Sequence, residues 1–337
     1  MSLLPYLLRV VDRHDLAAAD AEAAMQAILT GAATSAQIAA FLTALKMKGE
    51  TPEELVGFAR AMRRMATPVD PGLNGKALLD TCGTGGDGRD TFNISTVAAF
   101  VVAGAGVHVA KHGNRSISSR CGSADLLEAW GIEIAMSPEQ SARAIREVGI
   151  GFLFAPAVHS AMKHAQPVRT ELKMRTVFNL LGPLTNPSGA NAQLAGAPTE
   201  HAAELMAGAL ALLGLNRGFV VHGSDGLDEI TTTGPTTAWE IRDGRAEKRT
   251  LEPADFALRP ARAEDLQGGD RQRNLEIGNA ILGGASGPQR DIVLANAAAA
   301  LVAAGHAGTF LEGVALAVVS IDSGAAKEKV EALARFV

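Results

Sequence analysis

The stretch DTCGTGGDGRDTFNIST, residues 80–96, follows the apolar run KALL and precedes the helix-like run TVAAFVVAGAG. A strand, a glycine turn and a helix in succession form the unit from which parallel α/β sheets are built. Gly83, Gly85 and Gly88 satisfy the spacing G-x-G-x-x-G, which is often associated with dinucleotides. Because glycines let backbone N–H groups approach an anion closely, the stretch predicts a phosphate site at the end of a strand.

The surrounding residues argue against a dinucleotide. That interpretation requires a helix that begins within the turn and an acidic residue after the next strand. Here the helical pattern begins only near Thr96, and the next apolar run, VHVA, is followed by Lys111 and His112. A Walker loop is excluded because no Gly-Lys-Ser/Thr follows the glycines. Ser95 and Thr96 instead stand at a helix start, where free N–H groups favour an anion.

Two further polar clusters follow predicted strands. The loop after VHVA carries Lys111, His112, Asn114 and Arg115, and Ser116, Ser118, Ser119 and Ser123 lead into another helix. Since successive strand–loop–helix units open at one edge of a parallel sheet, both loops are expected to face the same ligand. The loop after GFVV carries Asp225, Asp228 and Glu229. Carboxylates beside a phosphate site suit Mg²⁺, so this cluster predicts a magnesium site.

The pattern along the chain predicts an α/β protein with a small helical domain. Residues 1–72 show helical periodicity, with Thr34 or Ser35 and then Thr51 as N-caps and Glu54 completing a capping box. From residue 76, strands alternate with helices, including a short strand at 132–135 and a helix capped by Ser137. This alternation indicates a larger domain with a mostly parallel central sheet covered by helices. Residues 173–193 interrupt the alternation and are interpreted as a crossing between domains.

Composition narrows the class of protein. A chain of 337 residues suggests about two domains. The net charge of -5 argues against a surface that coats nucleic acid. No apolar run reaches the roughly 20 residues that cross a bilayer, and the N-terminus lacks a basic leader, so a mature cytoplasmic protein is expected. Cys82 and Cys121 each stand alone, which predicts neither a disulfide framework nor a metal knuckle and fits a reducing compartment.

At the three clusters the sequence resembles the anthranilate phosphoribosyltransferase family. The resemblance covers essentially the whole chain and is carried by DTCGTGGDGRDTFNIST, KHGNRSISSRCGSADLLEAWG, RTVFNLLGPLTNP and HGSDGLDEITTTGPT. It implies transfer of a phosphoribosyl group from phosphoribosyl pyrophosphate to the amine of anthranilate, assisted by Mg²⁺, with two ions per site. It also implies a homodimer formed through the helical domain. Residues 1–72, joined by helices from about 165–188, would form that domain, and residues 73–164 and 189–337 the phosphoribosyl-binding domain.

The resemblance also assigns site residues. Those for phosphoribosyl pyrophosphate are Gly83, Gly86, Asp87, Asn93, Ser95, Thr96, Lys111 and Ser123. Those for anthranilate are Gly83, Asn114, Pro156, His159, Arg169 and Gly182. The Mg²⁺ ligands would be Ser95, Asp228 and Glu229. No residue is expected to act as a general acid or base, because an aromatic amine is already nucleophilic.

Two residues depart from the family pattern, and two other functions compete with the transferase. Met162 stands where some members carry an aromatic residue, and Lys173 where the family often has glycine. A pyrimidine nucleoside phosphorylase shares the phosphate loop, but KHGNR and LLGPLTNP favour the amine acceptor. A non-catalytic nucleic-acid-binding relative would show a basic surface and eroded metal acids, whereas this chain is acidic and keeps GLDE.

Overall fold

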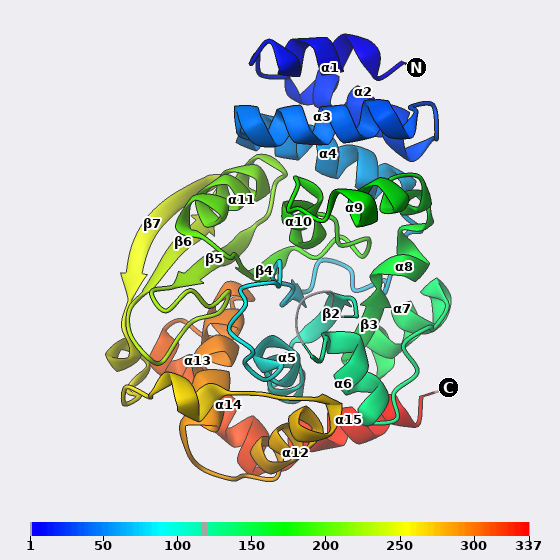
Figure 1. The fold of residues 1–337 in the computed structure, drawn as a ribbon. Coiled ribbons are helices and arrows are strands. Elements are labelled where there is room, and N and C mark those ends of the chain that lie inside the picture. Colours follow the sequence, from blue (N-terminus) through cyan, green and yellow to red (C-terminus); the bar gives the residue numbers. More distant parts are fainter. Residues whose placement is uncertain (1, 116–119, 337) are drawn as a thin grey trace.

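The computed structural model describes residues 2–115 and 120–336, so Ser116, Ser118 and Ser119 lie outside the described residues. Within these ranges one seven-stranded sheet has the order β3-β2-β1-β4-β5-β6-β7 (Figure 1). Strands β3 to β5 of that order are parallel, and β6 and β7 add an antiparallel hairpin. The strands are β1 Leu78–Asp80, β2 His108–Gly113, β3 Ile150–Phe154, β4 Ala192–Gly196, β5 Arg217–Gly223, β6 Thr236–Arg242 and β7 Arg245–Leu251. The mostly parallel sheet expected from the sequence is confirmed.

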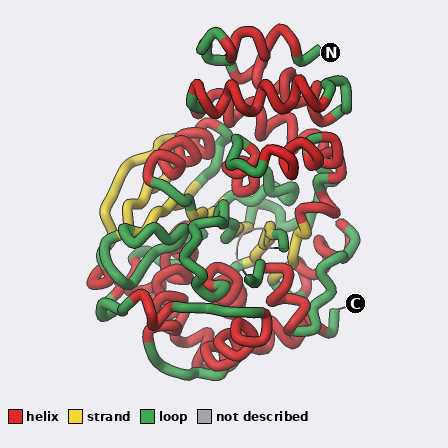
Figure 2. Tube along the Cα trace, in the orientation of Figure 1, coloured by secondary structure: helices red, strands yellow, loops and turns green. Residues whose placement is uncertain are grey.

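Strand β5 is buried on both faces, to which its alternate residues point, whereas the outer strand β7 is mostly exposed. Phe219 and Val221 of β5 join a cluster with the helices on one face, and Val220 joins a second cluster on the other. Figure 2 shows helices next to the strands, with the strands at the β7 edge on the outside of the molecule. The helices around the sheet are α5 Ile94–Gly104, α6 Ser123–Ala129, α7 Pro138–Glu147, α11 Glu200–Leu212, α12 Arg271–Leu282, α13 Pro288–Ala303, α14 Phe310–Asp322 and α15 Ala325–Ala334. Two 3-10 turns, Pro253–Phe256 and Ala263–Leu266, precede α12.

The N-terminal residues form helices, as expected, and they stack at one end of the molecule (Figures 1 and 2). Thr34 rather than Ser35 caps the third helix, and Thr51 caps the fourth with Glu54 in a capping box. The Ser137 cap of α7 is also confirmed. A capping hydroxyl satisfies an N–H group that the first helical turn leaves free, which is why these boundaries can be read from sequence. The helices are α1 Leu4–Val11, α2 Ala18–Leu29, α3 Ser35–Lys48 and α4 Pro52–Met65.

Residues 165–188, here called the crossing segment, pack beside these helices. Val168, Phe178 and Leu181 belong to the same apolar cluster as the buried side chains of α2, α3 and α4. Figure 1 shows α9 and α10 next to α4. The chain reaches this segment from β3 through α8 Ala155–Val158 and a 3-10 turn Ser160–His164. The segment itself contains α9 Gln166–Leu172, α10 Phe178–Leu181 and a 3-10 turn Gly182–Leu184.

One expected strand is absent and three others were not anticipated. Residues 132–135 form no strand; the N–H of Ala135 bonds locally to Glu133 Oε1 at 2.7 Å. Ile132 and Ile134 are buried while Glu133 is exposed, so a coil lying on the core produced a strand-like alternation. Strand β4 begins within residues 173–193, the stretch interpreted from sequence as a crossing, and β6 and β7 follow that stretch. None of the helices in the described ranges combines the length and apolar character needed to cross a bilayer.

Candidate active site

The glycine turn between β1 and α5 lies against the acidic loop that follows β5. We call residues 83–88 the glycine loop and residues 224–229 the acidic loop. The N–H of Gly85 donates to Asp228 Oδ2 at 2.7 Å, across 143 residues of sequence. A Cβ atom on Gly83 would lie 2.9 Å from the same Asp228 oxygen and 3.2 Å from Gly196 N. Only glycine therefore fits at position 83 without displacing the acidic loop or the backbone at the end of β4.

A second carboxylate meets the start of α5. The N–H of Ser95 donates to Glu229 Oε1 at 3.1 Å. Asp228 and Glu229 thus accept hydrogen bonds from the two backbone amides that the sequence predicts as anion donors, one in the glycine loop and one at a helix N-terminus. The structure confirms that these loops, separate in sequence, converge on one place. An incoming phosphate would compete with both carboxylates for these amides.

The acids repel one another. Burial, and then the charge of Asp87, raise the pKa of Asp228 to about 7. Burial, and then the charge of Asp228, raise the pKa of Glu229 to about 8. Asp228 and Glu229 are half-buried, and carboxylates this close tend to hold protons unless a cation offsets their charge. The donor set consists of hard oxygen atoms, which is the set that Mg²⁺ prefers, so these residues fit a magnesium site.

Asp225 does not belong to this group. Its Oδ2 accepts hydrogen bonds of 2.6 Å from the hydroxyls of Thr231 and Thr233, and its Oδ1 accepts one from the N–H of Leu227. These bonds shape the turn of the acidic loop. The interpretation of Asp225 as a third candidate metal ligand is therefore wrong, because its oxygens serve the folding of its own loop.

Lys111 lies beneath the glycine loop as a buried cation. Its side chain is 3% exposed, and Nζ donates to Thr81 Oγ1 at 3.2 Å. Burial lowers the pKa of Lys111, and the nearby charges of Asp80 and Glu229 partly oppose that shift. Asp80 is also buried; its oxygens accept from the N–H of His112 at 3.1 Å and from Asn186 Nδ2 at 2.8 Å. Lys111 therefore lies next to Thr81 at the end of β1, and its contact with an anion stays a prediction.

Cys82 forms no disulfide, as expected, but two side chains of other kinds lie close to it. The ligand atoms of Asp80, Cys82 and His112 lie within 4.8 Å of one another. Both Asp80 oxygens already accept hydrogen bonds, and Lys111 supplies a positive charge close by. We therefore interpret this cluster as part of the framework below the glycine loop.

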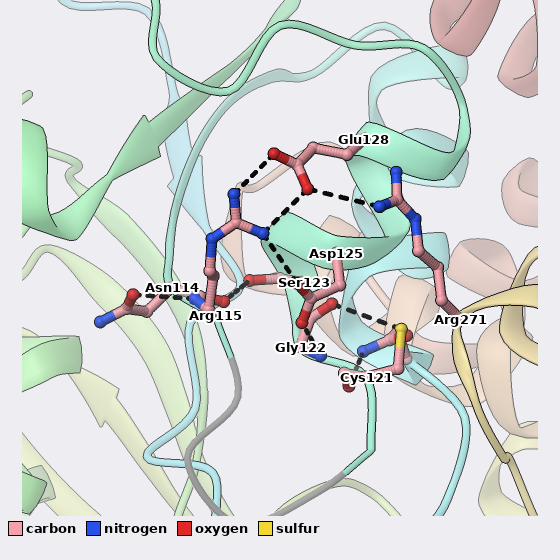
Figure 3. Close-up of polar contacts among 9 residues, drawn as sticks. Asn114, Arg115, Cys121, Gly122, Ser123, Asp125, Glu128 and Arg271 are labelled. Atoms are coloured by element: carbon pink, nitrogen blue, oxygen red, sulfur yellow. Dashed lines mark hydrogen bonds and ion pairs between the residues drawn. The ribbon is translucent and has the colours of Figure 1, made fainter.

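The loop after β2 contributes Asn114 and Ser123, but Arg115 is directed elsewhere (Figure 3). Ser123 Oγ donates to the carbonyl of Asn114 at 3.1 Å, which ties the loop to the start of α6. The Arg115 guanidinium contacts Glu128 at 2.6 Å and Asp125 at 3.0 Å. Those carboxylates already offset its charge. The expectation that Arg115 donates to the bound anion is wrong, because its side chain closes the loop onto α6.

Of the other expected phosphoribosyl residues, Asn93 and Thr96 lie at the start of α5. Asn93 Nδ2 donates to the carbonyl of Cys121 at 3.0 Å, and its Oδ1 is buried with no donor among the described residues. Thr96 is 1% exposed. Asn93 therefore links this helix to the β2–α6 loop, and Thr96 sits in the core behind the helix start.

The expected anthranilate residues lie mainly between the sheet and the crossing segment. His112 Nδ1 is 3.1 Å from the carbonyl of Gly182, and the His112 and His159 rings lie 5.1 Å apart. Burial lowers the pKa of His112 to about 3 and that of His159 to about 4, so both rings are neutral at pH 7. The Nε2 atoms of both histidines are buried and accept or donate no hydrogen bond within the described residues. Two neutral imidazole rings suit contact with an apolar aromatic ring. They carry no charge that would pair with an anion.

Arg169 of α9 lies over an aromatic ring of the crossing segment. Its guanidinium lies 5.2 Å from the centre of the Phe178 ring, and burial lowers its pKa. Met162 lines a small hollow together with His159. Pro156 and Asn114 are exposed, so the structure gives them a place at the rim rather than in the buried group.

Sequence reasoning missed one residue. Arg175 of the crossing segment donates to the carbonyl of Gly85 at 3.3 Å and also to the carbonyl of Gly86. The contact spans 90 residues of sequence, and no local pattern around Arg175 indicates it. Nearby, Lys173 has a φ of 48°, the left-handed conformation that favours glycine, which gives a physical reason for the glycine expected there.

Comparison with known proteins gives one consistent picture. A model of the glycosyl transferase family, α/β domain, matches residues 75–327, and that of its helical bundle domain matches residues 4–66. The chain is 76% identical over 336 residues to an anthranilate phosphoribosyltransferase of Solibacter usitatus, covering 100% of this chain and 99% of that protein.

Solved structures agree. A crystal structure of anthranilate phosphoribosyltransferase from Thermus thermophilus is 43% identical, with a TM-score of 0.92 over 98% of each chain. The enzyme of Saccharomyces cerevisiae in complex with phosphoribosyl pyrophosphate and Mg is 30% identical, with a TM-score of 0.89 over 99% of this chain and 97% of that one.

Proposed function

The chain belongs to the anthranilate phosphoribosyltransferase family and transfers the phosphoribosyl group of phosphoribosyl pyrophosphate to the amine of anthranilate in tryptophan biosynthesis; from that premise we propose how its residues divide the work. The observation that carries the assignment is the pair of bonds from Gly85 N–H to Asp228 and from Ser95 N–H to Glu229. These bonds bring two carboxylates that could hold a metal next to backbone amides that could bind an anion. A reaction that expels pyrophosphate needs both kinds of group.

The phosphoribosyl donor would be bound by Gly83, Gly86, Asp87, Asn93, Ser95, Thr96, Lys111 and Ser123. The glycine-loop amides and the start of α5 would bind its phosphates, and Lys111 would neutralise part of their charge. Ser95, Asp228 and Glu229 would hold Mg²⁺, and we propose two ions per site. When bound, the metal neutralises charge that develops on the leaving pyrophosphate.

The acceptor would be bound by Gly83, Asn114, Pro156, His159, Arg169 and Gly182. The Arg169 guanidinium can hold a planar carboxylate through two parallel hydrogen bonds, which a lysine cannot do. His159 stays neutral because of its burial, so it shapes the pocket rather than pairing with the carboxylate. No side chain acts as a strong base; the site works by positioning the aromatic amine in line with the anomeric carbon and by excluding water.

The expected product distinguishes this function from its nearest rival. Incubation with anthranilate, phosphoribosyl pyrophosphate and Mg²⁺ should release one pyrophosphate for each N-(5-phosphoribosyl)anthranilate formed. A parallel incubation with thymidine and inorganic phosphate should release no thymine. Thymine release without the first reaction would indicate a pyrimidine nucleoside phosphorylase instead.

We also propose a homodimer formed through the helical domain. Leu4, Leu8 and Val11 of α1 are 46%, 56% and 56% exposed, and their spacing places them on one face of the helix. Met47, at the end of the neighbouring α3, is 68% exposed. A row of exposed apolar side chains on one face is typical of an obligate interface between subunits.

We also propose how the chain divides into two domains and in which cellular compartment the protein lies. Residues 1–72 with 165–188 would form the helical domain, and residues 73–164 with 189–337 the phosphoribosyl-binding domain. Val168, Phe178 and Leu181 of the crossing segment pack with α2–α4, which supports grouping them; the same apolar cluster continues into α11 and β5 and so joins the two proposed domains. We propose a cytoplasmic location, since Cys82 carries a thiol that fits a reducing compartment.

A further inference from the structure

Arg175 connects the crossing segment to the glycine loop. Its exposed side chain donates hydrogen bonds to the carbonyl oxygens of Gly85 and Gly86. Both glycines have left-handed φ angles, 66° and 73°, so the loop turns sharply at the two residues that Arg175 holds. No carboxylate pairs with Arg175 among the described residues; its partners are the loop carbonyls.

The hydrogen bonds from Arg175 determine where the N–H groups on the other side of the glycine loop point. In a trans peptide the C=O and the following N–H point in opposite directions. The described residues contain no cis peptide bond, so the N–H groups of Gly86 and Asp87 point away from Arg175. Neither N–H donates to any described residue, whereas the neighbouring Gly85 N–H donates to Asp228. Two adjacent amides are thus left as free donors on the face opposite Arg175.

The residues that follow Arg175 are buried and hydrogen-bonded. Thr176 and Val177 follow it directly and are 4% and 0% exposed, and the N–H of Thr176 bonds to Asn179 Oδ1 at 3.0 Å. Arg169, the proposed clamp for the anthranilate carboxylate, lies in the same segment. The crossing segment therefore carries one arginine toward each of the two substrates.

We propose that Arg175 is a positioning residue for the pyrophosphate of the donor substrate. It holds the carbonyls of Gly85 and Gly86 so that the N–H groups of Gly86 and Asp87 face the phosphates, and it ties the glycine loop to the segment that binds anthranilate. The proposal rests on the proposed function, because it concerns how the loop of that site is oriented. A guanidinium on a carbonyl also polarises the peptide, which strengthens the N–H on its far side as a donor.

The test compares Arg175→Met, which keeps the stem but removes the donors, with Arg175→Lys and with a control, Arg146→Met on α7. Arg175 and Arg146 are both exposed, so all three variants should fold. For Arg175→Met we expect the Michaelis constant for phosphoribosyl pyrophosphate to rise about tenfold, the effect of losing two modest hydrogen bonds. The constant for anthranilate should stay within about twofold of the parent value. Arg175→Lys should recover part of the loss, and Arg146→Met should match the parent.

Two measurements report on the loop without turnover. Calorimetry should show weaker binding of inorganic pyrophosphate with Mg²⁺ to Arg175→Met. Trypsin should cleave the ligand-free variant faster after the exposed Arg89, next to the glycine loop, than it cleaves the parent. An unchanged cleavage rate, unchanged pyrophosphate affinity or an equal loss for both substrates would overturn the proposal. Failure of the parent protein to convert anthranilate would overturn the proposed function instead, and the cleavage comparison would still decide the role of Arg175 in holding the loop.

Discussion

Asp228 Oδ2 accepts a hydrogen bond of 2.7 Å from the N–H of Gly85, which joins a carboxylate of the acidic loop to an amide of the glycine loop. Glu229 makes the equivalent contact with the N–H of Ser95. In this structure the carboxylates therefore occupy the donors that phosphates would use. We expect binding of the donor substrate to exchange these partners, so that the phosphates would take the amides and the carboxylates would be free to hold a cation.

Removing both acidic charges should abolish this exchange. We expect Asp228→Asn with Glu229→Gln to lower kcat at least about 100-fold, because the site loses the charges that would hold the metal. The fold should persist, since both amide side chains can still accept the N–H bonds; circular dichroism checks this. Asp243→Asn, in the exposed turn between β6 and β7, removes the same kind of charge and should change nothing. Full activity of the double variant at saturating Mg²⁺ would refute the metal assignment.

The raised carboxylate pKa values predict that ligand binding expels protons. With the pKa of Asp228 at about 7 and that of Glu229 at about 8 in the ligand-free protein, protons occupy these groups increasingly as the pH falls. A metal must displace those protons, so Mg²⁺ activation should weaken between about pH 8 and pH 6, up to about tenfold per proton and pH unit. Calorimetry of magnesium pyrophosphate binding in buffers of different ionisation enthalpy counts the protons released at pH 7. A count of zero would contradict the prediction.

Arg169 should act on one substrate only. We expect Arg169→Ala to raise the Michaelis constant for anthranilate by about 100-fold, the effect of losing a charge-assisted pair of hydrogen bonds, with little change for phosphoribosyl pyrophosphate. Arg169→Lys should recover only part of this loss, because an ammonium lacks the planar pair of donors. Steady-state kinetics with each substrate varied in turn provides the measurement. Equal effects on the two substrates would exclude a carboxylate clamp.

Lys173 offers a test of stability rather than catalysis. Its φ of 48° places a lysine in the left-handed region at the end of α9. Lys173→Gly should remove that strain and raise the free energy of unfolding by up to about 1 kcal/mol, after the larger backbone entropy of glycine in the unfolded chain is deducted. Lys173→Ala keeps a Cβ atom and should give no such gain. A glycine variant less stable than the alanine variant in urea denaturation would show that the conformation is not strained.

The exposed face of α1 should control the oligomeric state. Leu8→Glu places a charge in the centre of the row formed with Leu4 and Val11 and should convert a dimer to a monomer in sedimentation velocity. Leu212→Glu on α11 is the matched control, since Leu212 is 53% exposed but lies on a different helix. A dimer that survives Leu8→Glu, or that Leu212→Glu disrupts, would place the interface elsewhere.

Local chemistry explains why much of the fold could be predicted from sequence. Thr51 and Ser137 predict helix starts because the hydroxyl of an N-cap residue accepts a hydrogen bond from a nearby backbone N–H. This interaction involves no residue that is distant in sequence. The anion loops were predicted from glycines and hydroxyls that follow apolar strands. The strand predicted for residues 132–135 is absent, because alternate residues of a coil can be buried in the same pattern as those of a strand.

The site was less predictable where a residue's role depends on distant partners. Arg115 and Arg175 are both exposed arginines in loops, yet one closes onto Glu128 and the other onto the glycine loop. Asp225 and Asp228 stand three residues apart in one acidic loop, yet Asp225 bonds to the threonines of its own turn. Such assignments follow from how the chain folds back on itself, and a single sequence carries no local signal for them.

The loss of anthranilate fluorescence on mixing with phosphoribosyl pyrophosphate tests the central claim most directly. With Mg²⁺ present, the fluorescence should decay to completion as the amine is glycosylated, and one pyrophosphate should appear for each anthranilate lost. With EDTA in place of Mg²⁺ the decay should fall at least about 100-fold in rate. An anthranilate signal that stays constant in both mixtures, or that decays equally fast with EDTA, would contradict a magnesium-assisted phosphoribosyl transfer at this site.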